Sequence, residues 1–213
     1  MDGASRRRLI LIRCGTDDGW MRGFESKVTA TMITLETERT ILRPWRDEDI
    51  PTWVAMCADA RVMEFYTMPL ARDEACAQVE GMRARMKRDG YGWWVLEIKD
   101  GASVAGVMVL QDVPFETHFT PAIEIGWRLV PEAWGKGYAS ESGAALLDFA
   151  FNELQRSQVV AVTSAINVRS RRVMERLGMV YDPDDDFEHP RIEVGHPLRR
   201  HVLYRKKKPT PIL

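Results

Sequence analysis

The chain is poor in cysteine and has no excess of charge of either sign. Its 213 residues include 3 cysteines, Cys14, Cys57 and Cys76, and no Cys-x-x-Cys pair. An odd number without that spacing disfavours a disulfide framework and a zinc site, so we expect no bound metal and a cytoplasmic location. The formal net charge is −1 at pH 7. The chain therefore lacks the overall basic field that would attract nucleic acid.

Long hydrophobic runs are also missing. No apolar stretch approaches the roughly 20 residues that a helix needs to span a bilayer, so no membrane association is expected. Near the start, Arg6-Arg7-Arg8 precede the run Leu9–Ile12, which Arg13 interrupts. A signal-peptide core needs about 7–15 apolar residues, so this run is too short. We expect residues 1–31 to be a poorly ordered extension, residues 32–207 to be a single domain and residues 208–213 to be a tail.

From Thr34 onward the hydrophobic pattern alternates between the periods of strands and helices. The helix after Asp47 should turn Ile50, Trp53, Val54 and Cys57 inward, and Lys99-Asp100-Gly101 should form a hairpin turn. The remaining helices are expected at residues 73–87, 139–154 and 168–177. Strands are expected at residues 40–45, 93–98, 104–113, 123–130, 159–163, 179–181 and 201–205. This order predicts an α/β fold built on a mixed sheet.

A glycine-rich segment lies where a strand is expected to give way to a helix. Gly135-Lys136-Gly137-Tyr138-Ala139 follows the strand that ends near Val130. Glycine allows a close backbone approach to a ligand, and the free N–H groups of a helix N-terminus bind phosphate. Taken alone, the two glycines can equally be a simple turn, and no Gly-Lys-Ser/Thr follows that would make a P-loop.

A second segment opens the last expected helix. Asn167 stands where a strand ends, so it is suited to cap the helix, and Ser170 follows three residues later. The helix is expected to end at Gly178, followed by Met179. Capping accounts for Asn167 but not for the whole pattern.

Together the two segments resemble the GNAT superfamily of acetyl-CoA-dependent N-acetyltransferases. In that family the pyrophosphate loop reads Gln/Arg-x-x-Gly-x-Gly/Ala, matched here from Trp134 to Ala139 with only the first position different. The later helix of the family begins Asn-x-x-Ala/Ser and ends at Gly-Phe/Met, matched by Asn167, Ser170, Gly178 and Met179. The resemblance extends from about Leu35 to Arg205.

The RimJ/RimL-type branch of that superfamily is similar over further segments. It shares the opening Glu36-Thr37-Glu38-Arg39 with Leu42-Arg43, a Glu-x-Gly strand at Glu124 and Gly126, and the run from Ser170 to Met179. These motifs follow one another in the family's order. The resemblance implies a mostly antiparallel sheet flanked by helices and splayed at a cofactor cleft.

The same resemblance implies where acetyl-CoA, the cosubstrate, would bind. The pantetheine arm would pair with backbone groups of Leu129 and Val130, as an added strand does. The pyrophosphate would lie on the amides of the loop, and the last helix would face the same channel. The cofactor-binding residues implied are Leu129, Val130, Gly135, Lys136, Gly137, Tyr138, Ala139, Asn167 and Ser170.

Amine attack on a thioester requires the amine to lose a proton, because primary amines are mostly protonated at pH 7. Glu124 is our candidate base, although strand alternation places it either in the cleft or in solvent. Many relatives carry a tyrosine proton donor seven residues after the asparagine, whereas this chain has Met174. Ser170 or water would then assist departure of the thiolate.

Several alternatives stay open at this level. The segment from Asp182 to His189 either attracts a cationic acceptor or is a solvated surface, and Arg205–Lys208 is interpreted as a frayed basic tail. The same fold could serve as a non-catalytic acyl-CoA sensor or scaffold, and a nucleotide-binding protein is a third reading. The acceptor could be a protein N-terminus or a small-molecule amine, and the oligomeric state could be monomer or homodimer.

Overall fold

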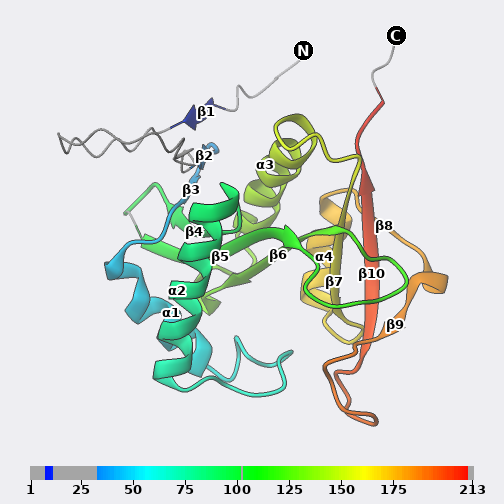
Figure 1. The fold of residues 1–213 in the computed structure, drawn as a ribbon. Helices are drawn as coiled ribbons and strands as arrows, with labels where there is room; N and C mark the ends of the chain where they lie inside the picture. The colour runs from blue at the N-terminus through cyan, green and yellow to red at the C-terminus, as the bar shows by residue number, and fades with distance from the viewer. Residues whose placement is uncertain (1–7, 12–32, 102, 211–213) are drawn as a thin grey trace, which may run out of the picture.

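The structure is a computed structural model, and it describes residues 8–11, 33–101 and 103–210. One sheet runs through the molecule, with helices on both of its faces (Figure 1). The strand order is β1-β2-β3-β4-β5-β6-β7-β10-β8, and β9 pairs with β10. The strands are β1 Arg8–Leu11, β2 Ile33–Glu36, β3 Thr40–Arg43, β4 Trp93–Ile98, β5 Ser103–Asp112, β6 Ile123–Leu129, β7 Gln158–Ser164, β8 Val180–Tyr181, β9 Phe187–Glu188 and β10 Arg200–Lys207.

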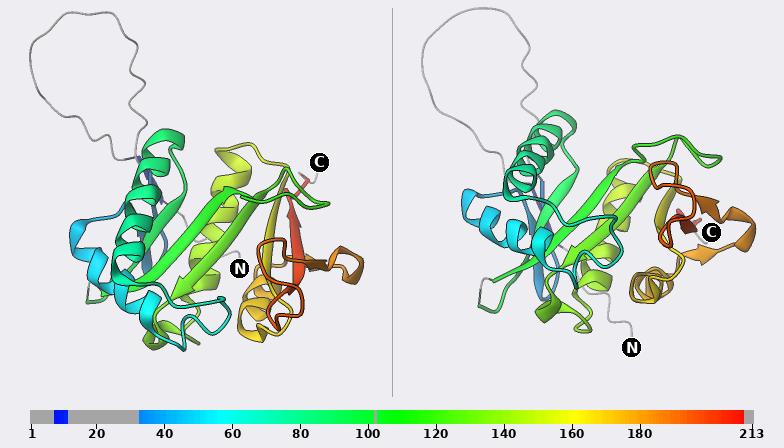
Figure 2. Two further views of the ribbon diagram at one scale, coloured as in Figure 1. Left: turned by 60° about the horizontal axis from the view of Figure 1, so that its bottom comes forward. Right: turned by 90° about the horizontal axis from the view of Figure 1, so that it is seen from below.

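The helices divide between the two faces of the sheet (Figure 2). Helices α1 and α2 contact β4 and β5 from one side, and α3 and α4 cover the other. The helices are α1 Ile50–Ala58, α2 Arg72–Asp89, α3 Tyr138–Asn152 and α4 Val168–Arg176, and the 3₁₀ helices are η1 Asp47–Asp49, η2 Pro131–Ala133 and η3 Pro183–Asp185. Each expected helix and strand is present within two residues of its predicted ends, and the mixed α/β sheet is confirmed.

Strand alternation in β6 explains why both faces of the sheet are buried. Ile125 and Leu129 join the large core beneath α3, together with Phe149. On the other face of the sheet, Val107 of β5 packs with Trp53 in a smaller core beneath α1 and α2. Because successive side chains of a strand point to opposite faces, Glu124, Gly126 and Arg128 lie on the α1/α2 face.

Strands β6 and β7 are parallel neighbours that pair at one position only, Glu124 with Val160. The other pairings among the described strands are antiparallel. Beyond that single contact, β6 continues to Leu129 and β7 continues to Ser164, and the two strands do not pair with each other again. The sheet therefore opens between the carboxyl ends of these two strands.

The basic C-terminal cluster differs from the sequence-based interpretation, and the expected N-terminal extension is described only in part. Strand β10 pairs with β7 as far as Lys207, and the ammonium groups of Lys206 and Lys208 donate to the carbonyls of Gly178 (3.0 Å) and Phe151 (2.7 Å). The basic cluster is thus part of a strand and not a frayed tail. Strand β1 lies within the expected extension and pairs with β2, while residues 1–7 and 12–31 of that extension lie outside the described residues.

No helix in the described part of the chain is both long enough and apolar enough to cross a membrane.

Candidate active site

A cavity of about 340 Å³ lies where β6 and β7 separate. Its walls come from the segment between α1 and α2, the end of β6, the loop before α3, the first turn of α3 and the length of α4. The volume lies within the range of small-molecule sites. Of the residues implied by the family resemblance, the cavity is lined by Leu129, Gly135, Gly137, Tyr138, Ala139, Asn167 and Ser170.

The loop before α3 has the geometry of a phosphate cradle. Gly135 and Gly137 adopt φ values of 72° and 84°, a region that other residues enter only at a cost. A Cβ atom built on Gly135 would meet no atom within 4 Å. Gly137 is the N-cap of α3, so the helix presents its free N–H groups and positive dipole end at the cavity. Lys136 is exposed and is not among the lining residues.

The cradle is held from outside by Arg39, which precedes β3. Its guanidinium donates to the Lys136 carbonyl at 3.0 Å and to the Glu141 carboxylate at 2.6 Å. The hydroxyl of Thr37 donates to the same carboxylate at 2.6 Å. Glu141 lies in the first turn of α3, so these bonds fix the loop against the helix. This contact gives a structural reason for the Thr37 and Arg39 positions of the opening motif.

Trp134 stands where the family motif has Gln or Arg. Its indole N–H donates to the Leu129 carbonyl at 2.9 Å, and the Arg169 guanidinium stacks on its ring at 4.5 Å from the centroid. Arg169 also lies over the Phe65 ring at 5.5 Å and pairs with Glu64. Trp134 therefore joins the cradle to the end of β6 and to α4.

Asn167 and Ser170 lie together at the start of α4. The Asn167 side-chain oxygen accepts a hydrogen bond from the Ser170 N–H at 3.1 Å, and its amide donates to the Thr163 hydroxyl at 3.0 Å. The predicted capping role of Asn167 is confirmed. Both residues also line the cavity.

Helix α4 presents a basic face to the cavity that the sequence analysis did not single out. Arg169, Arg172 and Arg176 recur at helical spacing, and all three line the cavity. The Arg176 guanidinium donates to the Ser140 hydroxyl in the first turn of α3 at 3.3 Å, and Arg169 pairs with Glu64. A helix N-terminus and guanidinium groups in one cavity form an environment suited to negative charge.

The backbone of β6 shows which of its groups face the opening. The Val130 N–H donates to Ala105 of the β5 side at 2.9 Å, and its carbonyl accepts from Ala133 at 3.0 Å. In an antiparallel ladder such pairs alternate, so the odd residues Trp127 and Leu129 direct their N–H and C=O groups away from β5, towards β7. Trp127 and Leu129 line the cavity, whereas Val130 does not.

Glu124 lies near the start of β6, on the α1/α2 face of the sheet. It is half-buried and does not line the cavity. The Gln111 amide donates to its carboxylate at 2.7 Å. The Gln111 oxygen in turn accepts from Trp93 (2.9 Å) and Arg85 (2.8 Å), which fixes the orientation of the amide. Burial raises the pKa of Glu124, opposed by the Gln111 hydrogen bond and by the charges of Arg191 and Arg85.

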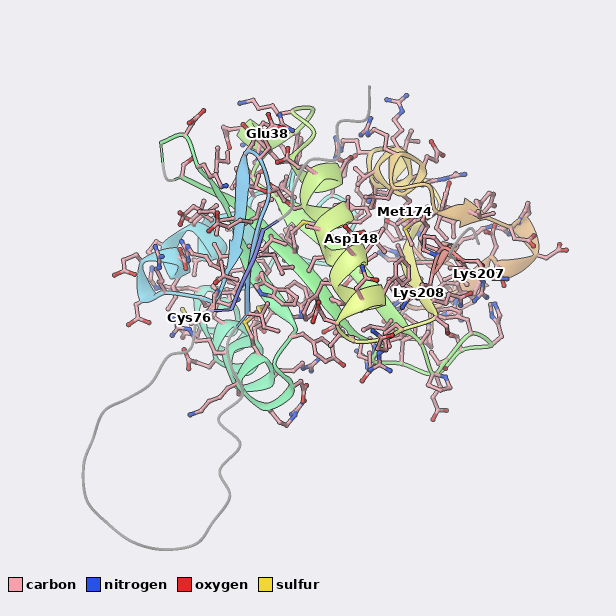
Figure 3. All side chains as sticks on the ribbon, turned by 90° about the horizontal axis from the view of Figure 1, so that it is seen from above. Glu38, Cys76, Asp148, Met174, Lys207 and Lys208 are labelled. Carbon is pink, nitrogen blue, oxygen red and sulfur yellow. The ribbon has the colours of Figure 1, made fainter. Side chains whose placement is uncertain are left out.

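Met174, which replaces the family's tyrosine, is almost fully buried in the core beneath α3 (Figure 3). It does not line the cavity. Ser170 is therefore the hydroxyl that α4 brings to the cavity wall.

Several carboxylates of the acidic segment after β8 are paired with arginines of the protein. Asp185 accepts from the Arg205 guanidinium at 2.7 and 2.8 Å, and Asp186 pairs with Arg200 at 2.9 Å. The Asp186 carboxylate also accepts from the Tyr181 hydroxyl at 3.0 Å. These partners argue against the interpretation that the segment attracts a cationic acceptor. The described residues contain no group of three or more His, Cys, Asp or Glu arranged to hold a metal ion.

Comparison with known proteins agrees with this geometry. Residues 39–180 match the acetyltransferase (GNAT) domain model. The FsC-acetyl coenzyme A-N(2)-transacetylase of Aspergillus fumigatus is 32% identical over 192 residues, which cover 83% of this chain and 80% of that protein. An acetyltransferase structure from Agrobacterium tumefaciens has a TM-score of 0.66 and 26% identity, over 89% of this chain and 100% of that one.

The chain belongs to the GNAT family of acetyltransferases, and the predicted GNAT fold is confirmed. RimJ of Mycobacterium smegmatis, in complex with CoA-disulfide, shares the fold with a TM-score of 0.61 and 21% identity, over 79% of this chain and 81% of that one. The Agrobacterium tumefaciens structure has the higher TM-score. The RimJ/RimL branch therefore stays a prediction.

Proposed function

We propose that this protein transfers an acetyl group from acetyl-CoA to a primary amine by direct attack. The observation that carries the proposal is that the glycine cradle at the α3 N-terminus and the basic face of α4 line one cavity. The cradle amides of Gly135–Ala139 would hold the pyrophosphate of CoA, and Asn167 and Ser170 would line the path of the pantetheine arm. Lys136 would add only a diffuse positive charge, because its side chain is exposed.

The pantetheine arm would lie against the free edge of β6. Leu129 and Val130 are the residues implied by the family, but both backbone groups of Val130 bond within the protein. The Leu129 carbonyl accepts from Trp134, so Leu129 would offer only its N–H group. Trp127 therefore takes the place of Val130 in the proposal. An N–H group of this edge would also stabilise the oxyanion that develops on the acetyl group.

Glu124 is the proposed general base. In the reaction the amine nitrogen bonds to the carbonyl carbon, the carbon–sulfur bond breaks, and CoA leaves as a thiolate. The proton lost by the amine passes to Glu124, directly or through water. The raised pKa of Glu124 favours this role, because a base works best when its pKa approaches the working pH. Ser170 would assist the departing thiolate.

The second candidate is a non-catalytic acyl-CoA sensor or scaffold. It is favoured by Met174, which puts a buried apolar side chain where many relatives have a proton donor. The RimJ/RimL branch and a cytoplasmic location also belong to the proposal, on the strength of the sequence motifs.

Release of CoA from acetyl-CoA in the presence of a panel of primary amines separates the two candidates. The enzyme should release CoA and form the acetylated amine in equal amounts. Tight binding of acetyl-CoA without transfer to any amine in the panel would favour the sensor.

A further inference from the structure

Arg128 is a cation without an acidic partner among the residues that the structure describes. It lines the same cavity as Arg61 and Arg169, but those two pair with Asp59 and Glu64. The Nε–H of Arg128 is buried and has no hydrogen-bond acceptor within the described residues. A buried donor without a partner is unfavourable, so its presence in a cavity wall points to an acceptor supplied by a ligand.

Two aromatic rings hold the Arg128 guanidinium in place. It stacks over Tyr66 at 4.0 Å from the ring centroid and over Trp53 at 4.8 Å. Its Nη1 also lies 3.6 Å from the Cys57 sulfur, a weak acceptor. A guanidinium held between rings is preorganised, and its planar fork of donors matches the two oxygens of a carboxylate.

Arg128 and Glu124 lie on the same face of β6. They are separated by four residues, a distance of about 13 Å along an extended strand. Helices α1 and α2 pack on this face, whereas the cradle and the basic face of α4 belong to helices that pack on the other face of the sheet. Arg128 therefore shares a face of the sheet with the proposed base and not with the helices proposed to hold the phosphates of CoA.

We infer that the acceptor is an amine that also carries a carboxylate, and that Arg128 binds this carboxylate while the amine approaches Glu124. This inference rests on the proposed function. Because Arg128 and Glu124 are well separated, the preferred acceptors should have a spacer between the amine and the carboxylate. Examples are ω-amino acids and dipeptides, which should react better than simple alkylamines.

The test compares each acid with its neutral amide, which keeps the same amine. CoA release is measured with 4-aminobutanoate, 6-aminohexanoate and glycylglycine, and with the carboxamide of each. We expect kcat/KM to be about 10- to 100-fold higher for the acids, the size of a hydrogen bond to a charged group. Arg128→Met should reduce this preference to about one, with the dissociation constant of acetyl-CoA unchanged.

Two controls keep the comparison specific. Arg88→Met removes the same charge from an exposed position on α2 and should leave the preference intact. If Arg128→Met does not fold, the wild-type comparison of acids with amides still decides the question, and Arg128→Gln provides a longer neutral replacement.

Equal kcat/KM for acids and amides would overturn the inference and leave the proposed function standing. A loss of acetyl-CoA affinity in Arg128→Met, with the preference for acids retained, would also overturn it, because Arg128 would then serve the cosubstrate. Absence of CoA release with every amine would overturn the proposed function, and this inference with it.

Discussion

Replacing Glu124 with Gln tests whether this carboxylate is the general base. Gln keeps the shape of the side chain and can still accept the hydrogen bond from the Gln111 amide. It cannot take a proton. Loss of a general base typically lowers the rate about 10²–10⁴-fold, or roughly 3–5 kcal/mol of transition-state stabilisation. We expect this loss in kcat, with little change in the affinity for acetyl-CoA.

The pH dependence of kcat/KM gives the sign of the effect. Glu124 accepts a proton only when ionised, so wild-type activity should fall as the pH falls through its pKa, which burial raises above the ordinary value for Glu. The Glu124→Gln variant should lack this acidic limb. Gln111→Met removes the donor that favours the ionised form, so its acidic limb should move to higher pH while Arg85 and Arg191 still oppose the shift.

A Glu124→Gln enzyme with full kcat and an unchanged pH profile would refute the assignment of Glu124 as the general base. In that case water or an already neutral amine would carry the proton. An acidic limb that stays in place in Gln111→Met would show that the hydrogen bond does not tune the carboxylate.

Three further predictions follow from other parts of the molecule. Ser170→Ala should lower kcat about tenfold. The Asn167 cap should be kept, because it uses the backbone N–H of Ser170. An unchanged kcat would show that Ser170 takes no part in the reaction. Burial, with His201 and Arg191 nearby, lowers the pKa of His189 to about 4, so its neutral form is favoured in the fold. The unfolding free energy should therefore fall by about 1–2 kcal/mol as the pH falls from 6.5 to 4. This figure allows for solvent screening, because His189 is only half-buried. Denaturant titrations of His189→Phe should lack this part of the pH dependence. A chain that begins at Met32 should still bind acetyl-CoA in calorimetry, and loss of binding would show that the segment containing β1 supports the site.

The sequence predicted the fold well because its strongest signals are local. The β-branched run at Val159–Thr163 predicts a central strand, and Gly135 with Gly137 predicts a turn into a helix; both are present. The charged strand β10 was not predicted at its full length, because Lys206 and Lys207 continue the charge of Arg205 without alternation of apolar and polar residues. Their strand depends on pairing with β7, a distant segment.

The site was predictable only in part, for the same physical reason. Asn167 and the cradle carry local signals, and the structure brings both to one cavity. The isolation of Arg128 from acidic groups is a property of the assembled fold, since it depends on which residues surround the side chain. The neutralisation of Asp185 by Arg205 likewise joins residues that are distant in the sequence.

Calorimetric titration of acetyl-CoA into two matched variants tests whether the cradle before α3 holds the phosphates of CoA. Gly135→Ala and Gly135→Asp impose the same strain on a backbone with φ of 72°, and the Cβ of either enters open space. Only Asp adds a negative charge beside the site. We expect Gly135→Asp to bind acetyl-CoA at least about tenfold more weakly than Gly135→Ala, because two like charges about 4 Å apart near a protein surface repel by roughly 1–4 kcal/mol. Equal dissociation constants for the two variants would contradict it.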